Sequence, residues 1–203
     1  MAGQATRVFC PRAMAADLEA FLLAAARMEG AEYRQEIAAL DPGQRVEVAK
    51  DLAIEAFPVD HRVPSLGYHL MRRRRRLLPA LAGADGAEIA ARRRGGETVE
   101  ESFEEVWLSY PGDTGPGVFH LEPRLAQSRV LMLECTFLGE AHRERAMRYG
   151  HLHLDDLAAF APSSRNEAIV LYHLSRRYAI GQLRGEIEAR LPALAARVHL
   201  FAS

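Results

Sequence analysis

Acidic and histidine residues follow apolar runs in the second half of the chain, and this pattern constrains the fold most. The runs at residues 129–133 and 168–172 have the length and composition of buried strands, and Glu134 and His173 follow them directly. Asp113 follows a third such run. In sheets with crossover connections, ligands collect beyond the strand ends. The pattern therefore predicts a sheet with a metal site at one edge.

Strands and helices are predicted to alternate along the chain. Strands are predicted at residues 6–10, 32–40, 44–49, 52–56, 68–71, 106–110, 129–133, 168–172 and 197–201. Helices are predicted at residues 18–28, 87–94, 140–148 and 182–190, and Asp155 and Asp156 suit the start of another. The Asp41-Pro42-Gly43 tripeptide predicts a turn between two of the strands. This order predicts β-α-β crossovers.

Length and composition favour one globular domain. The 203 residues, 49% of them hydrophobic, suffice for a sizeable core. There is no apolar run of about 18 residues and no signal-peptide pattern at the start, so we expect a cytoplasmic protein without a membrane partner. Cys10 and Cys135 fit neither a disulfide framework nor a Cys-x-x-Cys metal motif. That usage agrees with a reducing compartment.

The basic residues are nearly all arginine. Lys50 is the only lysine among 26 basic residues, and eight arginines lie in the runs Arg72–Arg76 and Arg92–Arg94. Arginine clusters grip phosphate and are one mark of nucleic-acid binding. A coding bias combined with a solvated face explains the same runs without any ligand. The runs fall in an arginine-rich excursion at residues 71–97, within a single domain of residues 1–203.

The polar residues at the predicted sheet edge suit metal chemistry. Imidazole and carboxylate together favour Zn²⁺, with Mn²⁺ or Fe²⁺ as alternatives. Asp113 could bridge two metals, with His61 and His173 as terminal ligands. His151 could donate a proton if Glu134 orients it. Spacing alone also allows structural histidines and a simple turn around Asp113.

Five motifs occur in an order that resembles a known family. The chain is similar to the C-terminal part of the ribonuclease Z group of the metallo-β-lactamase superfamily, endonucleases that trim the 3′ ends of tRNA precursors. The motifs are His61-Arg62-Val63-Pro64-Ser65-Leu66-Gly67-Tyr68, Gly112-Asp113-Thr114, Glu134-Cys135-Thr136-Phe137, Gly150-His151-x-His153 and His173-Leu174-Ser175-x-Arg177-Tyr178.

The resemblance implies a fold, an activity and a set of roles. The fold would be a four-layer αββα metallo-β-lactamase sandwich of the α+β class. The activity would be phosphodiester hydrolysis by a metal-activated water, on tRNA precursors, by a homodimer. His61, Asp113 and His173 would bind zinc, and Glu134 with His151 would handle protons. Arg177 and Tyr178 would contact phosphate or pack behind the last ligand.

The sequence also departs from the family. The His-x-His-x-Asp-His motif, which supplies most ligands of both metals, is absent, and no histidine precedes His61. We therefore expect an N-terminally incomplete sandwich that binds at most one metal weakly. Two alternatives to a ribonuclease follow: an inactive RNA-binding or interaction module, and a related hydrolase of non-nucleic-acid esters.

Overall fold

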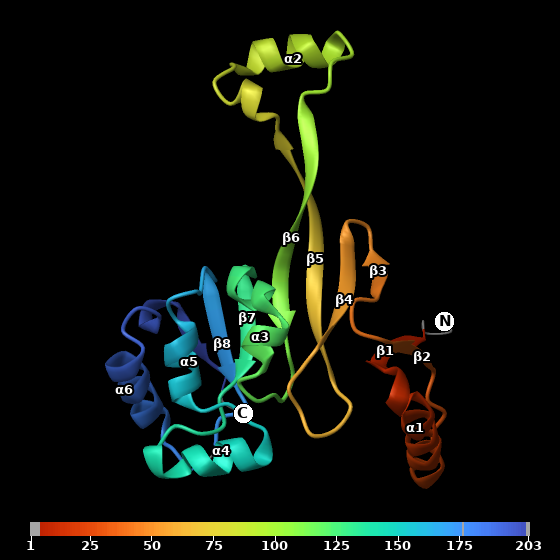
Figure 1. Ribbon diagram of the computed structural model, residues 1–203. Coiled ribbons are helices and arrows are strands. Elements are labelled where there is room, and N and C mark those ends of the chain that lie inside the picture. The colour runs from red at the N-terminus through yellow and green to blue at the C-terminus, as the bar shows by residue number, and fades with distance from the viewer. Residues whose placement is uncertain (1–4, 176, 202–203) are drawn as a thin grey trace.

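Two sheets and their helices make up the protein (Figure 1). The computed structural model describes residues 5–175 and 177–201. One sheet has the two strands β1 and β2, and the other has seven strands in the order β3-β4-β5-β6-β7-β8-β9. This mixed architecture of sheets and helices agrees with the predicted α+β class. No helix within the described ranges is long and apolar enough to cross a membrane.

The smaller sheet forms an N-terminal unit with helix α1. Strands β1 (Thr6–Pro11) and β2 (Gln35–Leu40) pair in parallel and are joined through α1 (Ala15–Glu29). The helix ends where Gly30 takes φ 64°, a left-handed conformation that glycine adopts without a Cβ penalty. The predicted strand, helix and glycine stop are confirmed here.

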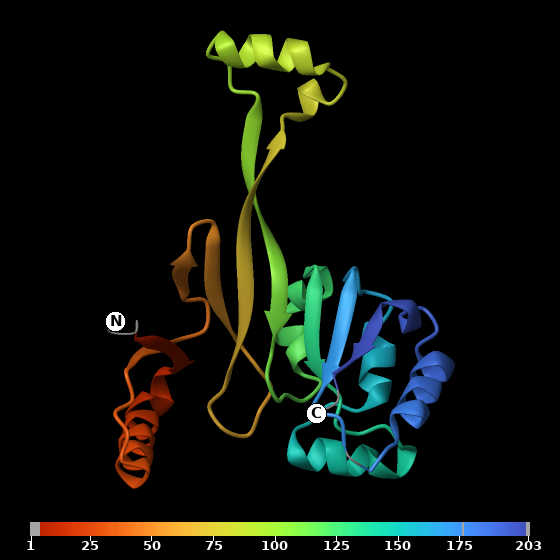
Figure 2. The ribbon, with the colours of Figure 1, turned by 180° about the vertical axis from the view of Figure 1, so that it is seen from behind.

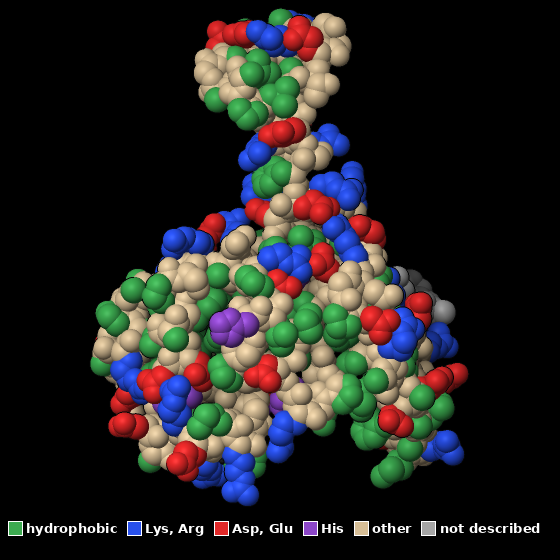
Figure 3. Space-filling model, in the orientation of Figure 1, with side chains coloured by type: hydrophobic (Ala, Val, Ile, Leu, Met, Phe, Trp, Pro, Cys, Tyr) green, Lys and Arg blue, Asp and Glu red, His purple; other side chains and the backbone are tan. Residues whose placement is uncertain are grey.

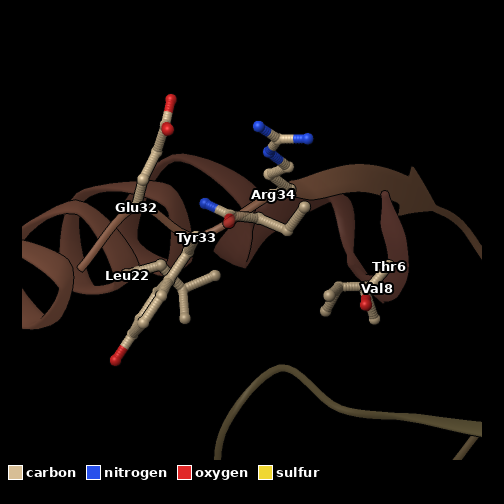
Figure 4. Close-up of a pocket in the computed structure, with 7 residues that line it drawn as sticks. Thr6, Val8, Leu22, Glu32, Tyr33 and Arg34 are labelled. Carbon is tan, nitrogen blue, oxygen red and sulfur yellow. The ribbon is translucent and has the colours of Figure 1, made fainter. Parts of the chain in front are cut away.

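A groove of about 500 Å³ runs beside α1, where the side chains of Val8, Leu22, Tyr33 and neighbouring residues line it (Figure 4). None of the residues of α1 is buried. The N-terminal unit therefore presents apolar side chains that the rest of the described chain does not cover.

The larger sheet is antiparallel on one side and parallel on the other. Strands β3 (Arg45–Ala49), β4 (Leu52–Pro58), β5 (Leu66–Leu77) and β6 (Glu100–Tyr110) pair antiparallel. Strands β7 (Val130–Glu134), β8 (Ala168–Tyr172) and β9 (Val198–Leu200) continue in parallel from β6. The crossovers predicted from alternating elements thus occur in the C-terminal half as well as between β1 and β2.

Strands β5 and β6 extend beyond their neighbours as a two-stranded arm (Figure 1). The arm carries a 3₁₀ turn, Pro79–Leu81, and helix α2 (Gly86–Arg94), whose N-cap Asp85 accepts a hydrogen bond from the backbone N–H of Glu88. The helix agrees with the predicted one. The strand predicted to start at Val106 begins six residues earlier, because β6 and the arginine run of β5 pair across the arm.

The main core lies between one face of the larger sheet and its helices. Leu131, Leu133, Ile169 and Leu171 point into this core and are at most 1% exposed. The helices that follow β6 in the sequence are α3 (Val118–Leu121), α4 (Arg143–Tyr149), α5 (Leu154–Phe160) and α6 (Ile180–Arg190). Figure 2 shows β7 and β8 in front of α3 and α5, whereas α4 lies below the strand ends. Helices α3 and α5 therefore lie on one side of these strands.

The turn predicted at Asp41-Pro42-Gly43 is confirmed, and the strands on either side of it do not pair with each other. Strand β2 pairs with β1, and β3 pairs with β4 in the other sheet. The turn therefore passes the chain from one sheet to the other, and Gly43 takes φ 84° there.

Candidate metal centre

Asp113 lies on a loop that hydrogen bonds attach to the segment after β4. The backbone N–H of Gly115 donates to the carbonyl of Asp60 at 2.7 Å, and that of Gly117 donates to Asp60 Oδ2 at 2.9 Å. Asp60 N–H in turn donates to Thr114 Oγ1 at 3.1 Å. A Cβ built on either glycine would lie 2.6 Å from Asp60 Oδ2. The two glycines let the loop pack against Asp60.

Glu134 is the buried centre of a hydrogen-bond network. It ends β7 and is 0% exposed. Its Oε1 accepts from the Thr114 N–H at 3.2 Å and lies 2.7 Å from His151 Nδ1. Its Oε2 accepts from the backbone N–H and the hydroxyl of Thr136 at 3.2 and 2.7 Å. This carboxylate therefore ties the Asp113 loop to His151.

His151 and His173 approach from two further loops. Helix α4 ends at Gly150, with φ 73°, and His151 follows it. His173 follows β8 with φ 55°, and its Nδ1 lies 3.0 Å from Thr136 Oγ1 and 3.5 Å from Asp113 Oδ1. The two imidazole rings are 5.2 Å apart between centroids. Asp113, His151 and His173 each offer a ligand atom, and these three atoms lie within 4.8 Å of one another.

His61 lies next to this cluster. Its ring centroid is 6.0 Å from that of His151, and its buried Nδ1 has no hydrogen-bond partner among the described residues. A buried polar atom without a partner is costly, which is expected where a ligand or ion completes the site. The imidazoles of His61 and His173 and the carboxylate of Asp113 are donors of the kind that zinc prefers. The residues present therefore fit a metal ion.

A cavity of about 830 Å³ opens beside the cluster. Asp113, Thr136 and His173 line it together with Tyr110 and Tyr172. The Tyr172 hydroxyl donates to the carbonyl of Gly112 at 2.8 Å, and burial raises the pKa of this phenol. A smaller cavity of about 320 Å³ lies on the His61 side of the cluster, next to Arg62 and Gly150. Space for a substrate thus exists on both sides.

Several residues of the sequence motifs serve the scaffold. His153 caps α5: its Nδ1 accepts from the Asp155 N–H at 3.2 Å, and its Nε2 donates to the carbonyl of Gly139 at 3.1 Å. The Tyr178 hydroxyl accepts from the Gly139 N–H at 3.3 Å and bonds to His142 Nδ1 at 2.7 Å. Arg177 is exposed. Both cysteines are free and buried.

Sequence reasoning missed three residues that build the site. Asp60, Thr114 and Thr136 hold the loops that present the cluster. The pair of glycines two residues apart, Gly115 and Gly117, was the available signal for the Asp60 contact. The contacts of the two threonines depend on how distant loops meet, which no local spacing encodes.

The fold and this cluster of possible metal ligands agree with the protein family that the sequence matches. The family model described as a β-lactamase superfamily domain matches residues 1–174, so the chain belongs to this family. Membership of the metallo-β-lactamase superfamily implies metal binding, in agreement with the clustered donors at Asp113, His151 and His173.

The relatives that are similar in sequence are tRNase Z or ribonuclease Z enzymes by name. tRNase Z TRZ1 of Arabidopsis thaliana is 27% identical over 194 residues, which are 94% of this chain and 69% of that protein. A ribonuclease Z of Bradyrhizobium diazoefficiens is 33% identical over 77% of this chain and 58% of its own length. The crystal structure of the short form of human tRNase Z superposes with a TM-score of 0.57 at 17% identity, covering 100% of this chain and 67% of that one. The chain therefore corresponds to only part of its relatives.

Proposed function

We propose that this chain carries part of the metal site of a phosphodiesterase of the ribonuclease Z type that acts on the 3′ ends of tRNA precursors. The observation that carries the proposal is the convergence of Asp113, His151 and His173, from three loops, within 4.8 Å. The names of the relatives supply the substrate class. The free, buried cysteines agree with a cytoplasmic location.

Asp113 and His173 would hold the metal, with His61 as a further ligand. Zinc in such a site acts as a Lewis acid on a phosphoryl oxygen and lowers the pKa of a bound water. Asp113 and His173 line the larger cavity, so a phosphodiester there would reach both. Thr136 is uncharged. It positions the His173 ring through the contact of 3.0 Å between Thr136 Oγ1 and His173 Nδ1.

His151 would carry the proton. Because a carboxylate only accepts hydrogen bonds, the contact with Glu134 Oε1 keeps the proton on Nδ1 and leaves Nε2 free. When the ring is protonated, Nε2 can donate to the oxygen that leaves as the phosphodiester breaks. Glu134 also stabilises the imidazolium that forms. The proposal thus assigns His151 to proton transfer and not to the metal.

The arm does not favour the alternative of an inactive RNA-binding module. Three arginines of the run in β5 pair with glutamates of β6: Arg73 with Glu104, Arg74 with Glu105 and Arg76 with Glu101, at 3.5, 3.4 and 2.8 Å. Figure 3 shows blue and red side chains beside each other along the arm. Much of the positive charge is therefore neutralised within the protein. The comparisons likewise point to enzymes.

The test is cleavage of a tRNA precursor with a 3′ extension in the presence of zinc. We expect only slow release of the extension by this chain, because the motif that supplies most of the metal ligands is absent, and complete loss of release in His173→Ala and His151→Asn. Zinc content separates the two roles, because His173→Ala should lose metal and His151→Asn should keep it. Faster turnover of simple carboxylic esters than of RNA would contradict the assignment. The homodimer that the resemblance implies is part of the proposal, and sedimentation tests it.

A further inference from the structure

Two cavities flank the candidate metal centre. The ring centroid of His151 is 6.0 Å from that of His61 and 5.2 Å from that of His173. His173 lines the cavity of about 830 Å³, and His61 lines the cavity of about 320 Å³, which we call the His61 cavity. A chain molecule whose reacting group lies at these rings would therefore extend into both cavities.

Arg62 brings a positive charge to the His61 cavity. It lines the cavity, is exposed to solvent and has no ion pair among residues 5–175 and 177–201, whereas several arginines of β5 pair with glutamates. Asp60, the acidic residue of the lining, accepts the backbone N–H of Gly117 at 2.9 Å and is thereby bonded to the Asp113 loop. The charge of Arg62 is therefore available to a ligand.

Neighbouring residues position the guanidinium of Arg62. Its Cζ lies 5.8 Å from the centroid of the Tyr149 ring, within the range of a cation–π interaction. The aliphatic stem lies beside Gly150, where an added Cβ would be 3.5 Å from Arg62 Cγ and 3.6 Å from His61 Nδ1. Because the N–H donors lie in the plane of the guanidinium, stacking on a ring leaves them free for an acceptor.

A nucleotide has the chemistry that this cavity offers to a ligand. Arginine binds phosphate through two parallel hydrogen bonds. Met147, which lines the cavity, and Tyr149, next to the guanidinium, are 65% and 39% exposed. The phosphate of a nucleotide would meet Arg62, and its ribose or base would cover these apolar side chains, since bases stack on aromatic rings and arginine.

We propose that Arg62 binds the RNA phosphate adjacent to the scissile one, while the scissile phosphate lies at Asp113 and His173. This inference rests on the proposed function, which places the reacting phosphodiester at the metal centre. Helix α4 borders the His61 cavity and has three arginines and one glutamate. Figure 3 shows blue side chains along the lower edge of the molecule, where Figure 1 places α4. This charge attracts RNA toward Arg62.

The experiment measures binding of a fluorescein-labelled tRNA precursor with a 3′ extension, by anisotropy at several salt concentrations with zinc present. Arg62→Met should weaken binding about tenfold, because a charge-assisted contact is lost. The slope of log K against log salt should become shallower by about 0.7, the value for one phosphate of a single strand. Arg165→Met is the matched control, because Arg165 is exposed and precedes β8, whereas His173 follows it.

Two further changes distinguish a phosphate contact from a structural role. Tyr149→Leu removes the ring and keeps the charge of Arg62, so affinity should fall about two- to fivefold with an unchanged salt slope. A methylphosphonate removes the charge of one phosphate, and we would place it on either side of the scissile position in turn. One placement should weaken binding to the wild type about tenfold and leave binding to Arg62→Met unchanged.

The outcomes separate this inference from the proposed function. Equal affinities in Arg62→Met and Arg165→Met, or methylphosphonates that act alike on wild type and Arg62→Met, would overturn the role of Arg62 alone. Zinc content should be the same in Arg62→Met and wild type. A chain that neither binds zinc nor cleaves the precursor would contradict the proposed function, whatever Arg62 binds.

Discussion

His151 Nδ1 lies 2.7 Å from Oε1 of Glu134, a carboxylate that is 0% exposed. The same carboxylate accepts from Thr114 and Thr136, so both of its oxygens are hydrogen-bonded. Groups that hydrogen-bond a functional imidazole fix its tautomer and ring orientation. The strand end at Glu134 therefore sets where the free Nε2 of His151 points, and the roles proposed above depend on this contact.

Replacing Glu134 by glutamine should lower both the stability of the protein and its turnover. The amide NH₂ of glutamine is a donor, and it would face hydrogen-bond donors of Thr114 or Thr136 that now bind the carboxylate. We therefore expect the free energy of unfolding to fall by about 1–3 kcal/mol. Turnover should fall about 10- to 100-fold, because His151 loses its charged partner. Denaturant unfolding and single-turnover cleavage measure the two effects. The control is Glu140→Gln, at an exposed glutamate, and equal turnover in both variants would contradict the role of Glu134.

Asp60 should control the loop that carries Asp113. Asp60→Ala removes the acceptor of the Gly117 N–H, which is a charge-assisted bond. We expect about tenfold weaker zinc binding with a stability loss of about 1–3 kcal/mol. Isothermal calorimetry with zinc measures the first quantity. Asp17→Ala, on exposed α1, serves as the control. Unchanged zinc affinity in Asp60→Ala would show that the loop holds its position without Asp60.

A buried histidine remote from the candidate metal ligands should make stability pH-dependent. His69 is 0% exposed, its Nδ1 lies 2.8 Å from Ser109 Oγ, and burial lowers its pKa from 6.5 to about 4. The unfolded chain therefore binds a proton that the folded chain rejects between these values. Stability is full above pH 6.5 and should fall by up to about 3 kcal/mol as the pH drops to 4.

The variant His69→Gln isolates this effect. Its unfolding free energy should change less between pH 6.5 and 4 than that of the wild type, in urea titrations at several pH values. Hydrogen bonds from Arg124 outweigh burial and lower the pKa of the neighbouring Glu122, so some acid sensitivity remains. His120→Gln, at an exposed histidine, is the control. Parallel pH profiles in wild type and His69→Gln would refute the assignment.

The glutamates of the arm should restrain RNA binding. Changing Glu101, Glu104 and Glu105 to glutamine frees the arginines that they pair with. RNA affinity at low salt should rise, and the slope of log K against log salt should steepen by about 0.7–0.9 per additional phosphate contact. A triple variant at the exposed Glu140, Glu144 and Glu188 has the same charge change. An equal gain there would assign the effect to net charge alone.

The sequence predicted the elements whose signals are local. The apolar runs before Glu134 and His173 became β7 and β8, and Gly30 ended α1 as expected. Pairing was not predictable in the same way. Strand β6 starts at Glu100 because its glutamates face the arginines of β5, which are 25 to 31 residues away in sequence. Likewise, the turn at Asp41-Pro42-Gly43 could not show that its strands enter different sheets.

For the candidate site, too, the local signals were predictable and the long-range packing was not. Asp113 and His173 were found because they follow predicted strands, and His151 because it lies in one of the motifs; the three residues do converge. Their roles stay predictions. The distance between His61 and the other ligands, and the contacts of Asp60, depend on how loops from β4 and β6 pack together. Such packing is set by the whole fold, so neither could be read from spacing.

Zinc binding tests the central claim most directly. We would titrate chelator-treated wild type, Asp113→Ala and His173→Ala with zinc, with Asp17→Ala and His199→Ala as controls at exposed positions. The account predicts at most one zinc per chain, bound weakly, with at least tenfold lower affinity in Asp113→Ala and His173→Ala only. Two tightly bound zinc ions per chain, or an affinity that neither substitution changes, would contradict it.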